Sequence, residues 1–125
     1  MSLVEEYLRL VTEIVDFRTN VYDRNTAEEH NRKVERMRII AAEIEKSYPE
    51  LKNEFCRMLS HNNKDIRIWV AHHILEVINC EQNYRRLALR EIRYRARADK
   101  SPYGFGEKVW LKDWYKSHPK DRWLR

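Results

Sequence analysis

The sequence predicts an all-α fold, on the strength of three observations. Only two Gly and three Pro occur in 125 residues, whereas sandwiches and hairpins need turn residues far more often. Apolar residues recur at spacings of three and four, the period of a helix face. Charged residues make up 36% of the chain, which suits helices whose outer faces carry Lys, Arg and Glu. The length fits one domain, which we place at residues 1–118 with a C-terminal tail at 119–125.

The first two helices are defined by apolar series on either side of a polar stretch, residues 19–25. The first series is Leu3, Tyr7, Leu10, Val11, Ile14 and Phe17. Thr26, with Glu29 three residues on, resembles a capping box and predicts the start of the second helix. The second series is Val34, Met37, Ile40, Ala41 and Ile44.

The next two helices are separated by residues 61–63, a polar break whose Asn can cap the fourth helix. Residues 47–50 predict the start of the third helix, because Pro49 costs no hydrogen bond in a first turn and Glu50 suits the positive end of the helix dipole. The third series is Leu51, Phe55, Met58 and Leu59. The fourth is Ile66, Val70, Ile74, Val77 and Ile78.

The fifth helix is predicted at about residues 81–98 and the sixth at about 107–117. Between them, residues 101–106 form the only Gly/Pro cluster, which we expect to be a shaped loop. In the sixth helix, Trp110, Leu111 and Trp114 share a face and are expected to belong to the core. Pro119 stops this helix, and residues 120–125 are expected to be loose, with Trp123 as the residue able to pack back.

Residues 51–78, LKNEFCRMLSHNNKDIRIWVAHHILEVI, resemble a HEAT repeat, with Arg67, Ala71 and Leu75 at the expected offsets. The match departs at His61, where HEAT repeats usually place Asp, and the Pro often found in the first helix is missing. Together with the short connections, the resemblance implies six helices in three antiparallel HEAT-like pairs stacked as an α–α superhelix. A compact helical bundle is the alternative.

Two further segments are similar to a family of small bacterial HEAT-like proteins of unknown function. They are PYGFGEKVWLKDW at residues 102–114 and IRIWVA at residues 66–71. This resemblance implies a bacterial cytoplasmic protein but no known activity. Some small helical proteins of this general kind are immunity partners of toxins, which is an analogy at the level of fold.

Charge is distributed unevenly along the chain. Residues 1–50 contain 8 Lys and Arg against 11 Asp and Glu, whereas residues 51–125 contain 17 against 9. The basic second half favours an acidic protein partner, with nucleic acid as the alternative. The net charge of +5 counts against inhibition of a nuclease toxin, whose active site is itself basic.

Other classes of protein find no support in the sequence. No apolar run approaches the length of about 20 residues that spans a membrane, and the N-terminus turns acidic at once, unlike a signal peptide. Cys56 and Cys80 lack paired or zinc-binding spacing, so we expect reduced thiols in a reducing cytoplasm, a redox pair being the alternative.

The sequence also shows no catalytic or cofactor motif. Two carboxylates at helical spacing within an apolar run, a phosphate loop and a nucleophile elbow are all missing. His72 and Glu76 have the i,i+4 spacing of two metal ligands, but no third ligand is apparent. We therefore expect no enzyme activity, no cofactor and no metal.

Two groups of residues are candidate partner-binding sites. Trp69 lies outside the apolar arc of the fourth helix, beside His72 and Glu76, and is either a binding anchor or packed under a neighbour. On the fifth helix, four arginines fall on one arc between two apolar faces. This arginine stripe consists of Arg86, Arg90, Arg93 and Arg97. One apolar face consists of Ala88, Leu89, Ile92 and Ala96, and the other consists of Tyr84, Leu87, Tyr94 and Ala98.

These features predict a non-catalytic protein–protein interaction module that binds an acidic partner through the arginine stripe. The alternatives are a nucleic-acid-binding helical repeat protein and a toxin-immunity protein. A solvated helix face would explain the stripe without any partner. The sequence leaves the oligomeric state open.

Overall fold

A computed structural model of the chain describes residues 1–16 and 24–124. Within these residues the chain forms six α-helices and two short 3₁₀ helices, with no β-strand, which confirms the all-α prediction. The elements in order are α1 (Leu3–Asp16), α2 (Arg24–Ser47), α3 (Pro49–Arg57), η2 (Met58–Ser60), α4 (Lys64–Glu76), α5 (Gln82–Ala98), α6 (Pro102–Ser117) and η3 (Pro119–Trp123).

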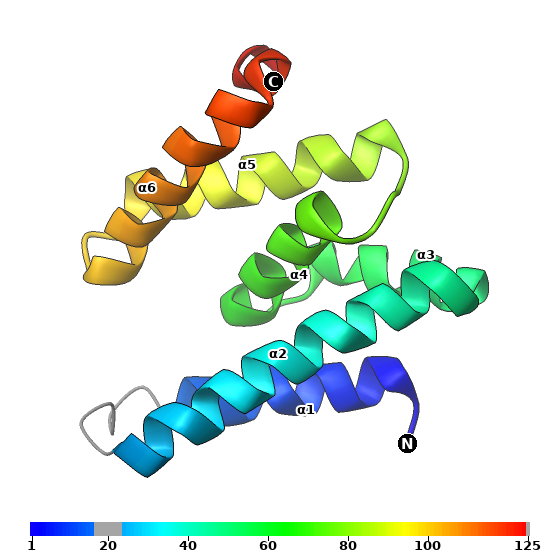
Figure 1. The fold of residues 1–125 in the computed structure, drawn as a ribbon. Coiled ribbons are helices and arrows are strands. Elements are labelled where there is room, and N and C mark those ends of the chain that lie inside the picture. Colours follow the sequence, from blue (N-terminus) through cyan, green and yellow to red (C-terminus); the bar gives the residue numbers. More distant parts are fainter. Residues whose placement is uncertain (17–23, 125) are drawn as a thin grey trace.

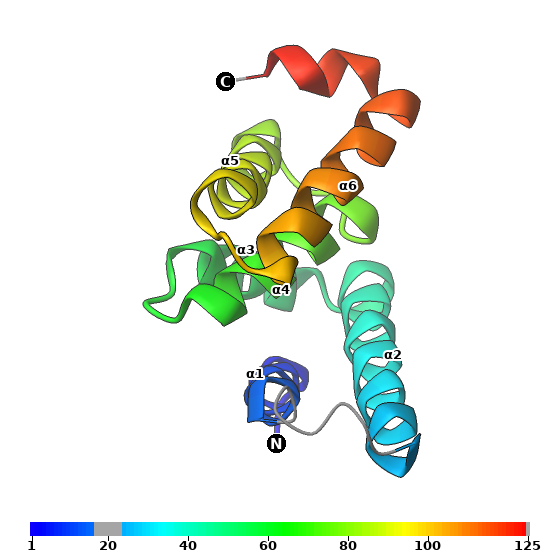
Figure 2. The same ribbon diagram turned by 90° about the vertical axis from the view of Figure 1, so that its left-hand side faces the viewer.

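The helices are arranged in levels that follow the order of the chain. Figure 1 shows α1 and α2 side by side and antiparallel at one end of the molecule, with α5 and α6 at the other. The view in Figure 2 places α3 and α4 between these two ends. The stacking of these levels as HEAT-like repeats remains a prediction.

The core is formed by the apolar faces that the sequence predicts. Its largest fully buried side chains are Tyr7 and Phe55, whose rings meet edge to face with centroids 4.9 Å apart. The α4 helix is the most enclosed, because α1, α3 and α5 all pack against it. In α6, Leu111 is buried while Trp110 and Trp114 are partly buried against the core, so this helix covers the end of the core with half-exposed aromatic rings.

The ends of α4 and α5 agree with their sequence signals. Asn63 caps α4, since its side-chain oxygen accepts hydrogen bonds from the backbone N–H groups of Asp65 and Ile66. The predicted span of α5 is confirmed, with Glu81 at the N-cap. Helix α2 begins at Arg24, earlier than the predicted cap; Phe17 and the Thr26 side chain lie outside the part described.

The Gly/Pro cluster is the one predicted loop that is wrong. Helix α6 begins at Pro102, so both glycines are helical. Proline suits this first position because its missing N–H has no helical partner there, and the Ser101 hydroxyl caps the helix by accepting from the N–H of Tyr103. Gly104 is required by close approach, because a Cβ at this position would lie 1.9 Å from the carbonyl oxygen of Asp99.

The prediction of a loose C-terminal tail is also wrong over residues 119–124. Residues Pro119–Trp123 form η3, and Arg93 of α5 donates hydrogen bonds to the carbonyl oxygens of Asp121 and Leu124. Trp123 itself is 80% exposed, so it does not hold this segment. The Arg93 guanidinium does, together with the Trp114 indole, which donates to the Asp121 carboxylate at 2.8 Å.

The length and apolar character of a helix decide whether it can cross a membrane. Within the described residues, none of the helices combines the length with the apolar character that crossing a bilayer requires.

Candidate functional site

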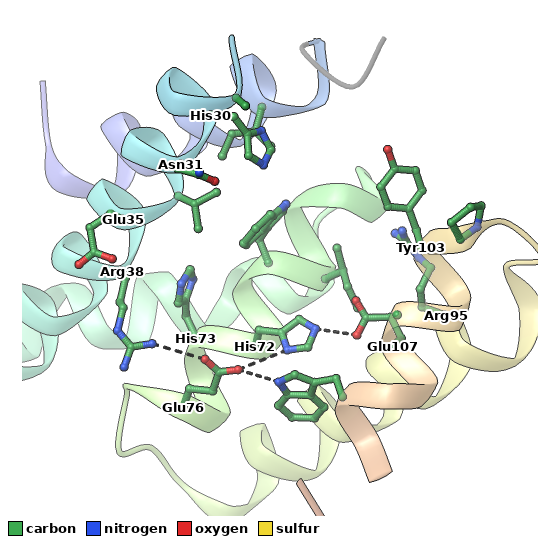
Figure 3. Close-up of a pocket in the computed structure, with 18 residues that line it drawn as sticks. His30, Asn31, Glu35, Arg38, His72, His73, Glu76, Arg95, Tyr103 and Glu107 are labelled. Carbon is green, nitrogen blue, oxygen red and sulfur yellow. Dashed lines mark hydrogen bonds and ion pairs between the residues drawn. The ribbon is translucent and has the colours of Figure 1, made fainter. Parts of the chain in front are cut away.

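A pocket of about 650 Å³ lies between α2, α4 and α6, with single contributions from Ile14 of α1 and Arg95 of α5. Figure 3 shows side chains from the three helices converging on it. Its walls combine aromatic and aliphatic groups, among them Val34, Trp69 and Trp110, with charged and polar groups. This size and mixed lining are typical of sites that take a small ligand or a side chain of a partner.

The α4 helix forms the floor of the pocket. Trp69, His72 and Glu76 follow one another at spacings of three and four, which places them on one face of the helix. These three residues and the neighbouring His73 all line the pocket. The opposite faces of α4 carry buried residues such as Val70 and Ile74. Three of the seven residues predicted to bind a partner are thus brought together here.

His72 is the centre of a charged network that joins α4 to α6. Its Nε2 lies 2.7 Å from Glu107 Oε2 and its Nδ1 lies 3.7 Å from Glu76 Oε1. Burial alone would lower the pKa of His72, but the two carboxylates outweigh burial and raise it to about 8. His72 is therefore largely protonated at neutral pH and forms an ion pair across the two helices.

Glu76 is held by three partners. The indole N–H of Trp110 donates to its carboxylate at 2.8 Å, His72 lies on the same helix, and Arg38 of α2 approaches to 3.6 Å. The nearby His72 lowers the pKa of Glu76, against the effect of burial, and the hydrogen bond from Trp110 acts in the same direction. Glu76 is therefore a structural anion that links α4 to α6.

His73 is adjacent to His72 but has the opposite electrostatic character. Its Nδ1 lies 2.6 Å from the hydroxyl of Tyr7, which is fully buried. Burial lowers the pKa of His73 to about 4 and raises the pKa of Tyr7 well above its usual value. Both groups are neutral at pH 7, so the Tyr7 hydroxyl donates to Nδ1 and the ring proton of His73 lies on Nε2.

Arg38 stands at the α2 rim with unused hydrogen-bonding capacity. Its side chain is 56% exposed, and within the described residues the carboxylate that pairs with its guanidinium is that of Glu76, at a distance too long for a hydrogen bond. A guanidinium has five N–H donors arranged to bind a carboxylate through two parallel bonds. Arg38 is therefore placed to receive an acidic group at the mouth of the pocket.

Trp69 satisfies both interpretations offered by the sequence. It is partly buried against the core and its ring stacks on that of His73 with centroids 6.2 Å apart, as the packing interpretation predicts. It also lines the pocket, as a binding anchor must. Its remaining exposed surface faces the space that a ligand would enter.

The arginine stripe is only partly as predicted. Arg86, Arg90 and Arg97 are exposed on α5 and do not line the pocket. Arg93 is not an exposed member, because it donates to the Tyr115 hydroxyl at 2.7 Å and to the C-terminal carbonyl groups. The stripe therefore has three exposed arginines and a fourth with a structural role.

The two apolar faces predicted for α5 also differ from each other. The face with Leu89 and Ile92 is buried as predicted. The second face is mostly exposed, since Leu87 and Tyr94 are exposed, Tyr94 by 57%, and only Tyr84 packs partly against the core. Thus α5 is buried along one side only.

Several site residues were missed by sequence reasoning. Tyr7, Arg38 and Glu107 come from three different helices, and no local spacing links them to α4. The sequence placed Trp110 and Trp114 on one face of α6, but the continuation of this pair to His118 as an aromatic ladder was missed, although His118 follows at the same i,i+4 spacing. Its members are Trp110, Trp114 and His118, with ring centroids 5.0 Å and 3.7 Å apart along the series.

The polar side chains of the pocket floor are engaged with one another and with side chains of α6. In the part of the chain that the structure describes, no three His, Cys, Asp or Glu side chains are grouped to hold a metal ion, and His72 and Glu76 are instead engaged with Glu107 and Trp110.

Comparison with protein-family models, curated sequences and solved structures finds no match for the chain.

Proposed function

We propose that this chain is a non-catalytic protein-interaction module that binds an acidic segment of a partner protein in the pocket between α2, α4 and α6. In this proposal an apolar side chain of the partner enters between Trp69 and Trp110, and a neighbouring carboxylate binds Arg38. The observation that carries the proposal is the Arg38 guanidinium, held beside an aromatic pocket with most of its donors unused among the described residues.

The state of the titratable groups favours binding over catalysis. General acid–base catalysis needs a group that can exchange a proton with a substrate. At the floor of the pocket, His72 is engaged by Glu107 and Glu76, and His73 accepts from Tyr7. These interactions engage both ring nitrogens of His72 and Nδ1 of His73 with groups of the protein itself, which favours a floor that binds a partner.

The charge and shape of the surface favour a protein partner. An aromatic pocket beside an arginine is the composition found at the energetic centres of protein interfaces. The three exposed arginines of α5 offer a second basic surface, on which nucleic acid is the competing partner. A bacterial and cytoplasmic setting, a HEAT-like origin and a toxin-immunity role remain expectations from the sequence resemblance alone.

Selection from a displayed library of random peptides tests the proposal. We expect the peptides that bind the wild-type chain to carry Asp or Glu next to an aromatic or aliphatic residue. Arg38→Gln and Trp69→Ala should each weaken binding of a selected peptide by about tenfold or more in fluorescence anisotropy, as for interface hot spots. Arg32→Gln is the matched control, because Arg32 is an exposed arginine of the same helix outside the pocket.

A second arm separates the pocket from the arginine stripe. Arg86, Arg90 and Arg97 are changed together to Gln, and Arg93 is kept because it holds η3. If the triple variant loses the peptide while Arg38→Gln binds it fully, the pocket proposal is wrong and the stripe is the binding surface. A mixed-sequence oligonucleotide serves as the nucleic-acid probe: tight binding whose affinity falls steeply with salt, by about one power per phosphate contact, would favour the alternative function.

A further inference from the structure

The two cysteines lie 24 positions apart in the sequence, but the fold brings the connection that contains Cys80 against α3, which carries Cys56. Lys52 is one turn before Cys56 on α3 and shares its face, and its ammonium donates to the carbonyl oxygen of Asn79 at 3.0 Å. Glu45, at the end of α2, accepts from the backbone N–H of Asn79 at 3.1 Å and pairs with Lys52 at 2.8 Å. These contacts hold the segment that contains Cys80 against the face of α3 that carries Cys56.

The environments of the two thiols are unequal. Cys56 is 1% exposed, whereas Cys80 is only partly buried in the connection between α4 and α5. The thiol–thiol interaction with Cys56 lowers the pKa of Cys80, and the nearby Arg85 and Lys52 act in the same direction. The same interaction, together with burial, raises the pKa of Cys56. Cys80 is thus the more accessible and the more readily ionised thiol.

Both cysteines are free thiols, as the sequence led us to expect, but their placement also favours the alternative, a redox pair. Their spacing in the sequence resembles no redox motif, because the pair is assembled by packing of α3 against the α4–α5 connection. Within the described residues both are unoxidised cysteines. A buried thiol behind an accessible one is the arrangement of a resolving and an attacking cysteine.

We propose that Cys56 and Cys80 are a reversible dithiol–disulfide pair, in which Cys80 attacks a low-molecular-weight disulfide and Cys56 resolves the product. The Cys80 thiolate attacks one sulfur of an oxidant such as glutathione disulfide, forming a mixed disulfide and releasing one glutathione thiolate. Cys56 then attacks the Cys80 sulfur, closes the intramolecular disulfide and releases the second glutathione. The protein loses two electrons and the oxidant gains them, while the two thiol protons end on the two glutathione molecules.

The bond would join α3 covalently to the connection between α4 and α5. It closes a loop within the chain, so it restricts the unfolded state more than the folded state and is expected to raise the melting temperature. The proposal concerns a modification site and does not depend on the occupant of the pocket.

The experiment treats the folded full-length chain with glutathione disulfide and follows it by intact mass spectrometry. The expected product is a monomer lighter by about 2 Da, the two hydrogens lost on closing a disulfide. After trypsin digestion without reductant, residues 53–57 should be linked to residues 68–85. Dithiothreitol should restore both thiols and the original melting temperature.

Two variants assign the order of attack. Cys56→Ser, with folding checked by circular dichroism, should stop at a mixed disulfide on Cys80, heavier by about one glutathione of 305 Da, because no thiol resolves it. Cys80→Ser should react far more slowly. If Cys56→Ser does not fold, Cys56→Ala replaces it. The proposal is overturned if the folded wild type stays reduced, collects two mixed disulfides or forms only intermolecular dimers, or if it closes the bond only after denaturation.

Discussion

The two sides of α4 place adjacent histidines in opposite surroundings. Toward α1, His73 accepts a hydrogen bond from the fully buried Tyr7, and its pKa falls to about 4. Toward α6, His72 lies between Glu76 and Glu107 beside the pocket, and its pKa rises to about 8. Two consecutive residues differ this much because they point about 100° apart on a helix and therefore meet different neighbours.

This contrast separates two roles within one helix. The α1 side is a neutral, closely packed contact whose polar groups bond only to each other, so it contributes stability. The α6 side is a charged contact at the edge of the pocket, where the same ion pairs that join the helices also shape the pocket floor. The α1 side should therefore respond strongly to loss of volume and to acid, and the α6 side to alkali and to added groups.

The largest expected effect is on the α1 side. Tyr7→Ala should lower the free energy of unfolding by about 3–5 kcal/mol, the cost of removing a buried aromatic ring, and it also leaves His73 Nδ1 without its donor. Chemical denaturation measures the change. Tyr94→Ala is the matched control, because Tyr94 is 57% exposed and its loss should cost no more than about 0.5 kcal/mol. Equal losses of unfolding free energy in Tyr7→Ala and Tyr94→Ala would contradict the role assigned to the α1 side of α4.

The next effect is the response of the α1 side to acid. The folded pKa of His73 lies below the usual value of 6.5, so between pH 6.5 and 4 the unfolded chain binds a proton that the folded chain does not. Stability should fall by about 3 kcal/mol as pH drops through this window. Urea unfolding of the wild type and of His73→Asn, whose amide accepts from Tyr7 but does not titrate, gives the difference. If the free energy of unfolding falls equally with pH in the wild type and in His73→Asn, His73 does not cause the loss of stability in acid.

A smaller effect is expected on the α6 side in alkali. The pKa of His72 is raised, so its contribution is fully present below pH 6.5 and is lost as pH rises through about 8. The loss should be about 2 kcal/mol, since the proton binds between Glu76 and Glu107, with Arg38 nearby. His72→Gln should remove this alkaline dependence while keeping the acidic one. A wild type equally stable at pH 6.5 and 9 would contradict the ion-pair network.

The sequence predicted more of the fold than of the site. Helix faces repeat every three or four residues, so the buried positions of α1, α2 and α4 follow from local pattern. One part of the pocket floor was also visible, because Trp69 lies outside the apolar arc of its own helix. The pocket walls were not visible, since Arg38 and Glu107 reach the floor from other helices.

The arginine stripe shows the limit of such patterns. Arg90 and Arg93 look alike on a helical projection, and only the return of η3 over α5 distinguishes them. Once Asp121 and Leu124 present backbone carbonyl groups at this place, Arg93 becomes a structural residue. Likewise, a proline and two glycines indicate a loop, whereas here proline begins a helix and Gly104 allows a close backbone approach.

The smallest expected effect tests how much room the α6 side has. Gly106 lies in α6 and lines the pocket, and a Cβ built there meets nothing within 4 Å. Gly106→Ala should therefore raise stability by about 0.5–1 kcal/mol, because alanine loses less conformational freedom in a helix. Gly104→Ala should do the reverse and cost about 1–3 kcal/mol through overpacking, since its Cβ would overlap the Asp99 carbonyl group. Thermal melts should show a higher melting temperature than the wild type for Gly106→Ala and a lower one for Gly104→Ala. A destabilised Gly106→Ala would show that the pocket edge is packed as closely as the α1 side, and the contrast between the two sides of α4 would then fail.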